Sequence, residues 1–386
     1  MQHSELEEIL DGVRRFVRQE VVPLEGQIDE DDEIPTAIIE QAKAMGLYGF
    51  AIPEEYGGLG LSTYEEAQLV FELGWTTPSF RSLFGTNNGI AGHTLLEGGT
   101  EAQKKTYLPK LASGEWVASF GLTEPDAGSD PATMTTKAVR DGDDWIIDGA
   151  KRYITNSPVA DVVMVFARTS PDKPPAEGVS VFMVPTSSPG LSIGPKDKKM
   201  GQAGAWSADV VLEGVRVPHS AMIGEQEGAG YVTAMRSLAH GRVHIAALCV
   251  GMAQRLVEET LQFALERKAG DTYIADFQLI QALMADSQTD TMAARALVLD
   301  VAQKFDAGTD TKMGPAAAKY FASEAVGRVA DRAVQVHGGA GYMRGVAVER
   351  FYRDARLFRI YEGTSQIQQL VIARQMIRSA GNTGGR

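Results

Sequence analysis

The sequence predicts an α+β fold in three segregated parts: an N-terminal α-helical domain (residues 1–115), a middle antiparallel β-domain (116–227) and a C-terminal four-helix bundle (228–386). Two observations predict this order. Apolar residues recur at helical spacing in the first and last parts, whereas the apolar period changes to two between them. Helices and strands therefore form separate blocks, unlike the alternating βαβ units of a dinucleotide-binding fold.

Helical spacing in the N-terminal part begins with Leu6, Ile9 and Val13 and continues to about Leu111. Short loops rich in glycine and proline interrupt it, as in IPEEYGGLGLS at residues 52–62. Because glycine and proline break helices, several helices separated by loops are expected here.

Strand patterns fill the middle part from about Trp116. The DGD sequence at residues 141–143 lies between alternating apolar residues and predicts a hairpin. The runs VVMVFA and VSVFMVP are typical of buried strands, and VLEGVRVP near Val211 ends the β-rich segment.

Four long helical segments follow, at residues 231–267, 275–305, 314–336 and 364–380. HGGAGY (337–342) contains the G-G-x-G pattern of a phosphate-binding loop. It follows a helix, however, and the phosphate fingerprint requires a preceding strand. A glycine-rich helix cap is therefore the better interpretation.

Composition narrows the class of protein. Among the 386 residues the formal net charge is −13, which argues against a general nucleic-acid or membrane-surface binder. Cys249 is the only cysteine, so a disulfide framework and a thiolate-rich metal site are both excluded. No run of about 18 apolar residues appears, and the N-terminus resembles neither a signal nor a transit peptide. We expect a soluble, cytoplasmic protein.

Metal binding is not expected either. The histidines at 93, 240, 244 and 337 show no spacing with nearby carboxylates that would predict a metal site. We interpret them as structural.

Two polar motifs lie where helices give way to strands. GLTEPDAGSD (121–130) combines hydroxyl groups with free backbone N–H groups, which suit the edge of a heterocycle or a phosphate. An ordinary turn is the alternative, because Ser, Asp and Gly favour turns. In KRYITN (151–156), Tyr153 could stack on a flat ring while Thr155 hydrogen-bonds its edge. A tyrosine packed at a strand end is the alternative.

Glu362 precedes the last amphipathic helix in IYEGTSQIQQLVIARQMI (360–377). An acidic residue near a helix N-terminus interacts favourably with the helix dipole, and a neighbouring Thr or Ser caps the first turn. Such a residue can also act in a reaction, and the other motifs must decide between the two roles.

Taken together, TEPDAGSD, YITN, QVHGGAGY, RFYRDAR and YEGTSQIQ closely resemble, in order and spacing, the acyl-CoA dehydrogenase family of flavoenzymes. The resemblance covers nearly the whole chain. It implies FAD as the cofactor and the oxidation of a saturated acyl-CoA thioester to the trans-2-enoyl-CoA.

The resemblance also implies which residues contact FAD. Thr123 would lie near the pyrimidine end, and Tyr153 to Thr155 would flank the isoalloxazine, with Thr155 near N5. Arg267 and residues 335–339 would hold the adenine and pyrophosphate across a subunit interface. The implied FAD-binding residues are Phe120, Leu122, Thr123, Gly128, Ser129, Tyr153, Ile154, Thr155, Arg267, Gln278, Gln335, Val336, Gly338, Gly339, Thr364 and Gln366.

Glu362 matches the catalytic base of most family members. It would remove the α-proton while the β-hydride goes to flavin N5. The α-hydrogen is barely acidic, so the base needs a dry pocket and the thioester carbonyl needs hydrogen-bond donors. The resemblance implies two donors, the backbone N–H of Glu362 and a ribityl hydroxyl of FAD. Some members place the base just before the position of Arg242, where this chain has Gly241. The substrate-binding residues implied or proposed are Ser129, Arg242, Tyr361, Gly363 and Arg81.

The chain departs from the family pattern at several positions. Tyr153 stands where tryptophan is frequent, although a tyrosine ring can still stack. Ala269 and Gly270 replace a hydroxyl residue and a phenylalanine, which weakens the expected FAD contact across the interface. Ala239 and Gly345 replace acidic residues. These departures warn against copying another member's substrate.

Arg81, in SFRSLFGTNNG, resembles an arginine of glutaryl-CoA dehydrogenases that meets the substrate's distal carboxylate. A surface or interface ion pair is the interpretation we favour, because most arginines make one. The basic run KDKKMG (196–201) is interpreted as a solvated face, with contact to the nucleotide end of CoA as the alternative.

The family resemblance implies an electron-transferring flavoprotein as electron acceptor and a homotetramer built as a dimer of dimers. An oxidase or flavin monooxygenase that uses O₂ on the same fold remains an alternative, as does a non-catalytic scaffold. The length, branching and terminal group of the acyl chain are left open.

Overall fold

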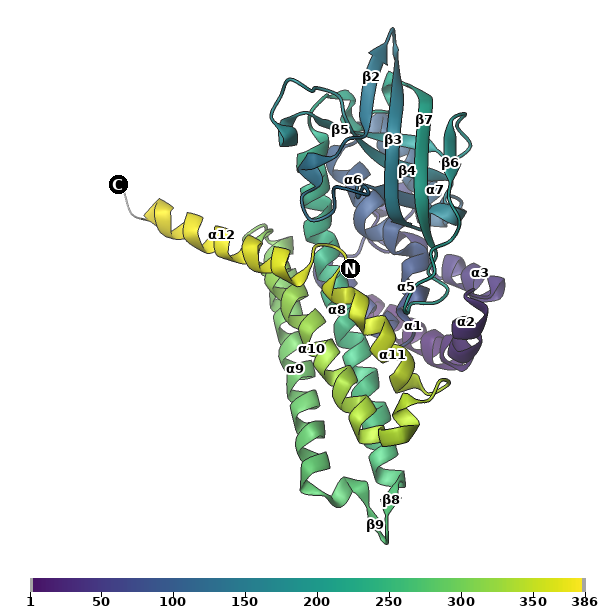
Figure 1. The fold of residues 1–386 in the computed structure, drawn as a ribbon, viewed down its shortest axis with the longest axis vertical. Helices are drawn as coiled ribbons and strands as arrows, with labels where there is room; N and C mark the ends of the chain where they lie inside the picture. Colours follow the sequence, from purple (N-terminus) through teal and green to yellow (C-terminus); the bar gives the residue numbers. More distant parts are fainter. Residues whose placement is uncertain (1–2, 384–386) are drawn as a thin grey trace.

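The structure, a computed structural model, describes residues 3–383. The β-sheet occupies one end of an elongated molecule, and long helices form the other end (Figure 1). One helix, α8 (Gly230–Glu266), runs from beneath the sheet along most of the helical part. The predicted order of helices, sheet and helices is confirmed.

The N-terminal part consists of short helices. Two of them start with capping boxes, at Ser62 with Glu65 and at Thr100 with Gln103, in which side chains satisfy free backbone N–H groups. The helices are α1 (His3–Phe16), α2 (Glu25–Asp31), α3 (Thr36–Ala44), α4 (Thr63–Leu73), α5 (Pro78–Gly85), α6 (Ala91–Gly98) and α7 (Glu101–Ser113). A π-turn (Thr86–Ile90) joins α5 to α6.

The middle part is a seven-stranded sheet in which β3 and β7 form the longest pair. Its strands are β1 (Ala118–Gly121), β2 (Lys137–Asp141), β3 (Asp144–Thr155), β4 (Val162–Arg168), β5 (Val179–Pro185), β6 (Leu191–Ile193) and β7 (Ser207–Pro218). The predicted hairpin is the β2–β3 pair.

The sheet is mixed, whereas the sequence predicted an antiparallel one. Strand β1 runs parallel to β4, with Ala118 opposite Val162, and β2 also meets the end of β4 in parallel. A parallel pair needs a long crossover connection, and the intervening β2–β3 hairpin supplies it. Alternation within each strand could not reveal this pairing, because the apolar period is the same in both kinds of sheet.

The C-terminal part contains the four predicted long helices, α8, α9 (Gln278–Asp306), α10 (Met313–His337) and α12 (Ser365–Thr383). Helices α8, α9 and α10 pack side by side, whereas α12 projects from the body (Figure 1). The sequence did not predict the short α11 (Ala347–Ala355) or the β8–β9 hairpin (Lys268–Ala269 and Thr272–Tyr273). Within residues 3–383 no helix is long and apolar enough to cross a membrane.

The position of β4 between two cores explains why its sequence is continuously apolar. Val162, Met164 and Phe166 face a core shared with α6 and α7, whereas Val163 and Val165 face a second core on the other side of the sheet. Both faces are buried, so the strand needs apolar residues at every position. A third core unites the N-terminal helices with α8, α9 and α10.

Candidate active site

Glu362 lies in the loop between α11 and α12, pressed against α8. Its backbone φ is +55°, a left-handed value uncommon for residues other than glycine. A Cβ added to Gly241 on α8 would lie 2.5 Å from Glu362 Oε2, so only glycine leaves room for the carboxylate at this point. Position 241 therefore cannot supply an alternative base while Glu362 occupies this place.

Two buried side chains hold the loop that carries Glu362. Gln368 Nε2, on α12, donates to the carbonyl oxygens of Glu362 (3.0 Å) and Gly363 (2.9 Å). Lys319 Nζ, on α10, donates to the same Gly363 oxygen at 2.7 Å. Neither residue could be assigned this role from the sequence, because the contacts depend on how α10 and α12 pack.

The Glu362 carboxylate is surrounded by positive charge. Burial raises the pKa of Glu362, while Arg81, Arg242 and Lys319 oppose this rise. Within the described chain, Glu362 Oε2 is buried without a hydrogen-bond partner, and so are the Nε atoms of Arg81 and Arg242. A buried carboxylate that faces cations without a direct bond is poised to exchange a proton with a ligand.

The favoured interpretation of Arg81 as a surface or interface ion pair is wrong for this structure. Arg81 is 6% exposed, and its charge interacts with Tyr361 and Glu362. Its guanidinium passes over Gly85, where an added Cβ would lie 2.5 Å from Nη1. Arg81 Nη2 donates to His244 Nδ1 at 3.0 Å. Arg81 therefore lies in the interior, where its charge acts on Glu362.

Two of the histidines interpreted as structural make specific polar contacts. His240 and His244, one helical turn apart on α8, both contact Glu66 Oε2 on α4. The three side chains could be considered a metal site. However, the distance from His240 Nε2 to Glu66 Oε2 is 2.8 Å and that from His244 is shorter, whereas ligands around a tetrahedral ion lie about 3.3 Å apart. The contacts are those of hydrogen bonds.

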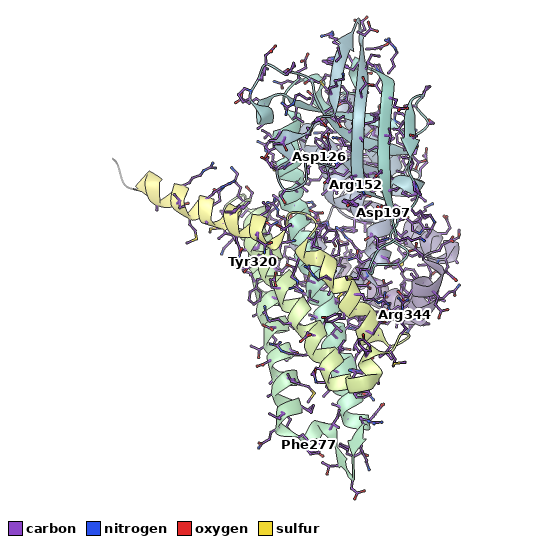
Figure 2. The ribbon with its side chains drawn as sticks, viewed as in Figure 1. Asp126, Arg152, Asp197, Phe277, Tyr320 and Arg344 are labelled. Atoms are coloured by element: carbon purple, nitrogen blue, oxygen red, sulfur yellow. The ribbon has the colours of Figure 1, made fainter. Side chains whose placement is uncertain are left out.

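The two strand-end motifs meet each other. The Arg152 N–H donates to the Thr123 carbonyl at 2.9 Å, which places GLTEPDAGSD beside KRYITN. A second contact joins the same two motifs: Lys151 Nζ binds Glu124 Oε1 at 2.7 Å, and both side chains are buried. Figure 2 shows Asp126 and Arg152 of these motifs near the lower edge of the sheet, toward the helical part.

The same edge connects to Arg81 through Asn156. Asn156 Nδ2 donates to the Ser82 carbonyl at 2.8 Å and lies 3.0 Å from Thr86 Oγ1. Ser82 directly follows Arg81 on α5, so α5 links the strand-end motifs to the surroundings of Glu362. The sequence placed Asn156 in a motif but gave it no role.

The exposed groups at this edge fit a flat, hydrogen-bonding cofactor. Tyr153 is 61% exposed, with a left-handed φ of +58° that turns its side chain out of the strand. Thr123 and Thr155 are half-buried, and Ser129 is exposed beside Gly128, where an added Cβ would meet nothing within 4 Å. An aromatic face, hydroxyl groups and an open glycine can therefore contact FAD. The other predicted residues near this edge are buried or half-buried: Phe120, Leu122 and Ile154.

The predicted adenine and pyrophosphate contacts lie elsewhere. Arg267 and Gln278 are exposed at the tip of the bundle, where Figure 2 labels the adjacent Phe277. Gly338 and Gly339 are exposed after α10, beside exposed Gln335 and buried Val336. Phe277 lies far from Arg152 in Figure 2, so a single chain does not bring the bundle tip and the strand-end motifs together. The remaining predicted residues are in or beside the Glu362 loop: half-buried Tyr361, Gly363 and Thr364, and exposed Gln366.

A helical–sheet–helical chain, with exposed aromatic and hydroxyl groups at the sheet edge and a carboxylate oxygen of Glu362 buried without a partner in the described residues, fits a class of flavin-dependent oxidoreductases. Comparison with known proteins identifies the family. The acyl-CoA dehydrogenase N-terminal domain matches residues 3–115, the middle domain 119–215 and the C-terminal domain 228–377. The chain belongs to the acyl-CoA dehydrogenase family, whose members are FAD-dependent oxidoreductases acting on acyl-CoA.

Two curated relatives cover almost all of the chain. A probable acyl-CoA dehydrogenase of Bacillus subtilis is 40% identical over 375 residues, which are 97% of this chain and 98% of the relative. The CarC subunit of the caffeyl-CoA reductase–Etf complex of Acetobacterium woodii is 37% identical over 352 residues, which are 91% of this chain and 92% of the relative.

Solved structures share the whole fold. Butyryl-CoA dehydrogenase from Megasphaera elsdenii superposes with a TM-score of 0.93 at 30% identity, covering 98% of this chain and 99% of that one. Glutaryl-CoA dehydrogenase from Mycobacterium smegmatis gives 0.91 at 32% identity, covering 97% and 95%. The FAD complex of PigA gives 0.92 at 28% identity, covering 97% and 98%.

Proposed function

We propose that this protein oxidises a saturated acyl-CoA thioester to the trans-2-enoyl-CoA, with Glu362 as the base that removes the α-proton. The observation that carries the proposal is the buried, unpartnered Oε2 of Glu362 against Gly241. A side chain at position 241 would clash with this carboxylate, and Arg81, Arg242 and Lys319 lower its pKa. FAD, when bound at the sheet edge, supplies the acceptor for the β-hydride.

The chain's own groups prepare Glu362 for proton transfer. Burial raises its pKa and makes it a stronger base than an exposed glutamate, while Arg81, Arg242 and Lys319 keep the carboxylate form accessible. Gln368 and Lys319 fix the loop, so the carboxylate and its backbone N–H keep one position. Arg242, buried with a free Nε, is suited to the CoA portion, as the family resemblance implies.

The proposal also includes the electron acceptor and the subunit assembly. We assign an electron-transferring flavoprotein as electron acceptor, which is supported by the Etf complex named for the Acetobacterium woodii relative. We also propose a homotetramer, as the family resemblance implies. The separation of Phe277 from Arg152 supports a second protomer at the FAD site, because Arg267 and Gln278, near Phe277 in the chain, would then contact FAD from a neighbouring protomer. A cytoplasmic location completes the proposal.

Glu362→Gln tests the role of the base. We expect kcat to fall about 10²–10⁴-fold or more, because a positioned base contributes roughly that factor. FAD should remain bound, since the substitution changes no residue of the sheet edge. The measurement is an anaerobic titration of the flavin absorption band with acyl-CoAs of different length, branching and terminal charge. Rapid bleaching in the Glu362→Gln variant would refute the proposal, and rapid reoxidation of the unaltered enzyme in air with peroxide release would identify an oxidase.

A second candidate concerns the substrate: a dicarboxylyl-CoA whose distal carboxylate binds Arg81. Arg81 is buried, its Nε is free and its charge acts on Glu362. A buried arginine with an unused donor favours an anionic ligand group, because an unpaired buried charge is costly. The similarity to a glutaryl-CoA dehydrogenase supports this candidate.

Arg81→Gln tests the second candidate. Loss of a charged hydrogen bond costs about 1.5–3 kcal/mol, so kcat/KM for glutaryl-CoA should fall roughly 10–150-fold. For butyryl-CoA, which has no distal carboxylate, the fall should be much smaller. Steady-state rates with both substrates give the comparison. Equal losses for the two, or equal turnover by the unaltered enzyme, would exclude a carboxylate-binding role.

A further inference from the structure

Four buried side chains form a continuous hydrogen-bonded chain beside Glu362. Arg81 on α5 donates from Nη2 to His244 Nδ1 at 3.0 Å, and His244 Nε2 contacts Glu66 Oε2 on α4. His240 Nε2 lies 2.8 Å from the same Glu66 oxygen. Glu66, His240 and His244 are 3%, 3% and 0% exposed. We call these four residues the Arg81 relay.

The donors and acceptors in the relay fix its protonation. An arginine only donates, so His244 Nδ1 must accept, and its proton must lie on Nε2, from which it donates to Glu66. His244 is therefore neutral, which agrees with burial lowering its pKa to about 4. His240 donates from Nε2 to Glu66 and from Nδ1 to the Gly89 carbonyl at 3.4 Å, so it carries both protons.

His240 is charged because of what surrounds it. Burial would lower the pKa of His240, but the facing Glu66 carboxylate outweighs it and raises the pKa. His93 from α6 stacks on the ring at 4.4 Å, and Phe305 from α9 lies 5.9 Å away. The other charged groups that act on His240 and its surroundings are Arg81 from α5 and Glu362 from the base loop.

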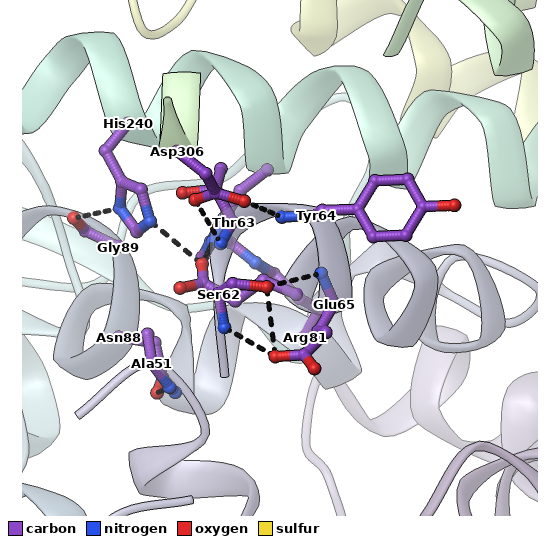
Figure 3. Close-up of polar contacts among 12 residues, drawn as sticks. Ala51, Ser62, Thr63, Tyr64, Glu65, Arg81, Asn88, Gly89, His240 and Asp306 are labelled. Atoms are coloured by element: carbon purple, nitrogen blue, oxygen red, sulfur yellow. Dashed lines mark hydrogen bonds and ion pairs between the residues drawn. The ribbon is translucent and has the colours of Figure 1, made fainter. Parts of the chain in front are cut away.

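The relay is anchored at the start of α4. Asp306, at the end of α9, accepts the backbone N–H groups of Thr63 (2.8 Å) and Tyr64 (2.9 Å), and Ser62 forms the capping box with Glu65. Figure 3 shows these contacts together with the bond from His240 to Gly89. Glu66 lies in the same first turn of α4, so the backbone that carries its carboxylate is held in place.

We propose that Glu66, His240 and His244 are positioning residues, which hold the Arg81 guanidinium in place beside the base Glu362. The inference rests on the proposed role of Glu362. Arg81 crosses Gly85 and Gly89, where added Cβ atoms would lie 2.5 Å and 3.3 Å from its nitrogens, so the two glycines leave room for the guanidinium. The hydrogen bond to His244 Nδ1 holds Arg81 Nη2 at one point, and Glu66 holds His244 in turn.

The relay has a consequence for the pH dependence of catalysis. Glu362 acts as a base only when ionised, so activity is lost as pH falls through its pKa. Among the charges that lower this pKa, Arg81 has the largest effect. Displacing the guanidinium should therefore raise the pKa of Glu362 and move the acid limb of the rate profile to higher pH.

A matched set of variants tests the proposal in the FAD-loaded enzyme. His244→Gln retains a donor near the position of Nε2 for Glu66 but removes the acceptor for Arg81. His93→Gln is the control, because His93 stacks on His240 but its buried Nδ1 makes no hydrogen bond in the described structure. We expect His244→Gln and Arg81→Gln each to move the acid limb of kcat/KM upward by about half to one pH unit, and His93→Gln to leave it in place.

The double variant gives the decisive comparison. If His244 acts through Arg81, Arg81→Gln/His244→Gln should show the same shift as Arg81→Gln alone, because coupled residues are non-additive. Additive shifts, or a His244→Gln profile that matches His93→Gln, would overturn the proposal.

Histidine NMR with isotope-labelled protein separates this inference from the proposed function. A neutral Nε2–H tautomer for His244 and a doubly protonated His240 support the relay whether or not any acyl-CoA reduces the flavin. The opposite tautomer for His244 would overturn the relay. Failure of every acyl-CoA to bleach the flavin would instead overturn the proposed function.

Discussion

Two buried ionic groups in this protein serve different purposes. Lys151 and Glu124, beneath the cofactor edge, have their hydrogen-bonding capacity used within the protein: Glu124 accepts from Lys151, from the Thr135 N–H and hydroxyl, and from the Thr136 N–H. Glu362, beside α8, has an unpartnered Oε2, and the Nε atoms of Arg81 and Arg242 are also unpartnered in the described part of the chain.

The difference distinguishes a structural network from a reactive one. A buried pair whose hydrogen-bond donors and acceptors are all used stabilises one conformation and has no free group to bind a ligand. A buried carboxylate and two guanidinium groups with unused atoms are costly unless a ligand completes them. The unused atoms therefore support the proposed role of Glu362 as the base, while the satisfied pair supports the edge proposed to contact the cofactor.

Lys151→Met should have the largest effect on stability. Removing one partner leaves Glu124 buried and unpaired, which costs about 3–5 kcal/mol of the free energy of unfolding. Because Arg152 joins Thr123 next to this pair, FAD should also bind more weakly. Urea unfolding and the fraction of FAD retained after gel filtration measure the two effects.

The double variant Lys151→Met/Glu124→Gln is the control. It removes both charges, so it should recover part of the lost stability. A Lys151→Met protein as stable as the unaltered one would show that the pair does not hold the cofactor edge, and the contrast with Glu362 would fail.

Local sequence explains which parts of this site could be predicted. Tyr153, Thr155 and Glu362 stand in short motifs with a recognisable order, and the long helices and strands follow from apolar periodicity. The mixed pairing of β1 with β4 is not encoded in either strand alone.

The relay shows why the rest could not be predicted. Glu66 and His244 are 178 positions apart, and Arg81 and His244 are 163 apart, so their contacts arise only from the packing of α4 and α5 on α8. The burial of Arg81 has the same origin, and the general preference of arginine for surface ion pairs gave the wrong expectation. The glycines at 85, 89 and 241 leave room for the side chains of Arg81 and Glu362, but no prediction was drawn from this pattern.

Asp354→Asn tests the comparison between structural and reactive buried groups, with a smaller expected effect on stability than Lys151→Met. Asp354 on α11 also has a buried, unpartnered oxygen, Oδ2, but its Oδ1 accepts the Gln202 backbone N–H in a contact between the bundle and the sheet domain. If an unused oxygen alone marked function, Asp354 would be as important as Glu362. We expect instead that Asp354→Asn leaves kcat unchanged and alters only the pH dependence of stability.

The direction of this pH dependence follows from the pKa of Asp354. Burial raises the pKa of Asp354 to about 7, above its unfolded value of about 3.9, so the folded state holds a proton that the unfolded state has lost. The stabilisation is full below the unfolded pKa and declines as pH rises toward 7. The amide introduced by Asp354→Asn is neutral throughout, so the variant should have a higher free energy of unfolding at about pH 8, by about 1–3 kcal/mol, with little change at about pH 4.

Asp290→Asn is the matched control because its pKa shift has the opposite sign. Two hydrogen bonds from Arg328 and one from Arg332 hold the pKa of Asp290 below its ordinary value, so its stabilisation is present at neutral pH and is lost as pH falls. Urea unfolding across this pH range should therefore show Asp354→Asn gaining stability, and Asp290→Asn losing it, at neutral pH. A loss of kcat in Asp354→Asn would contradict the distinction, because an orphaned oxygen outside the base loop would then matter to the reaction as well.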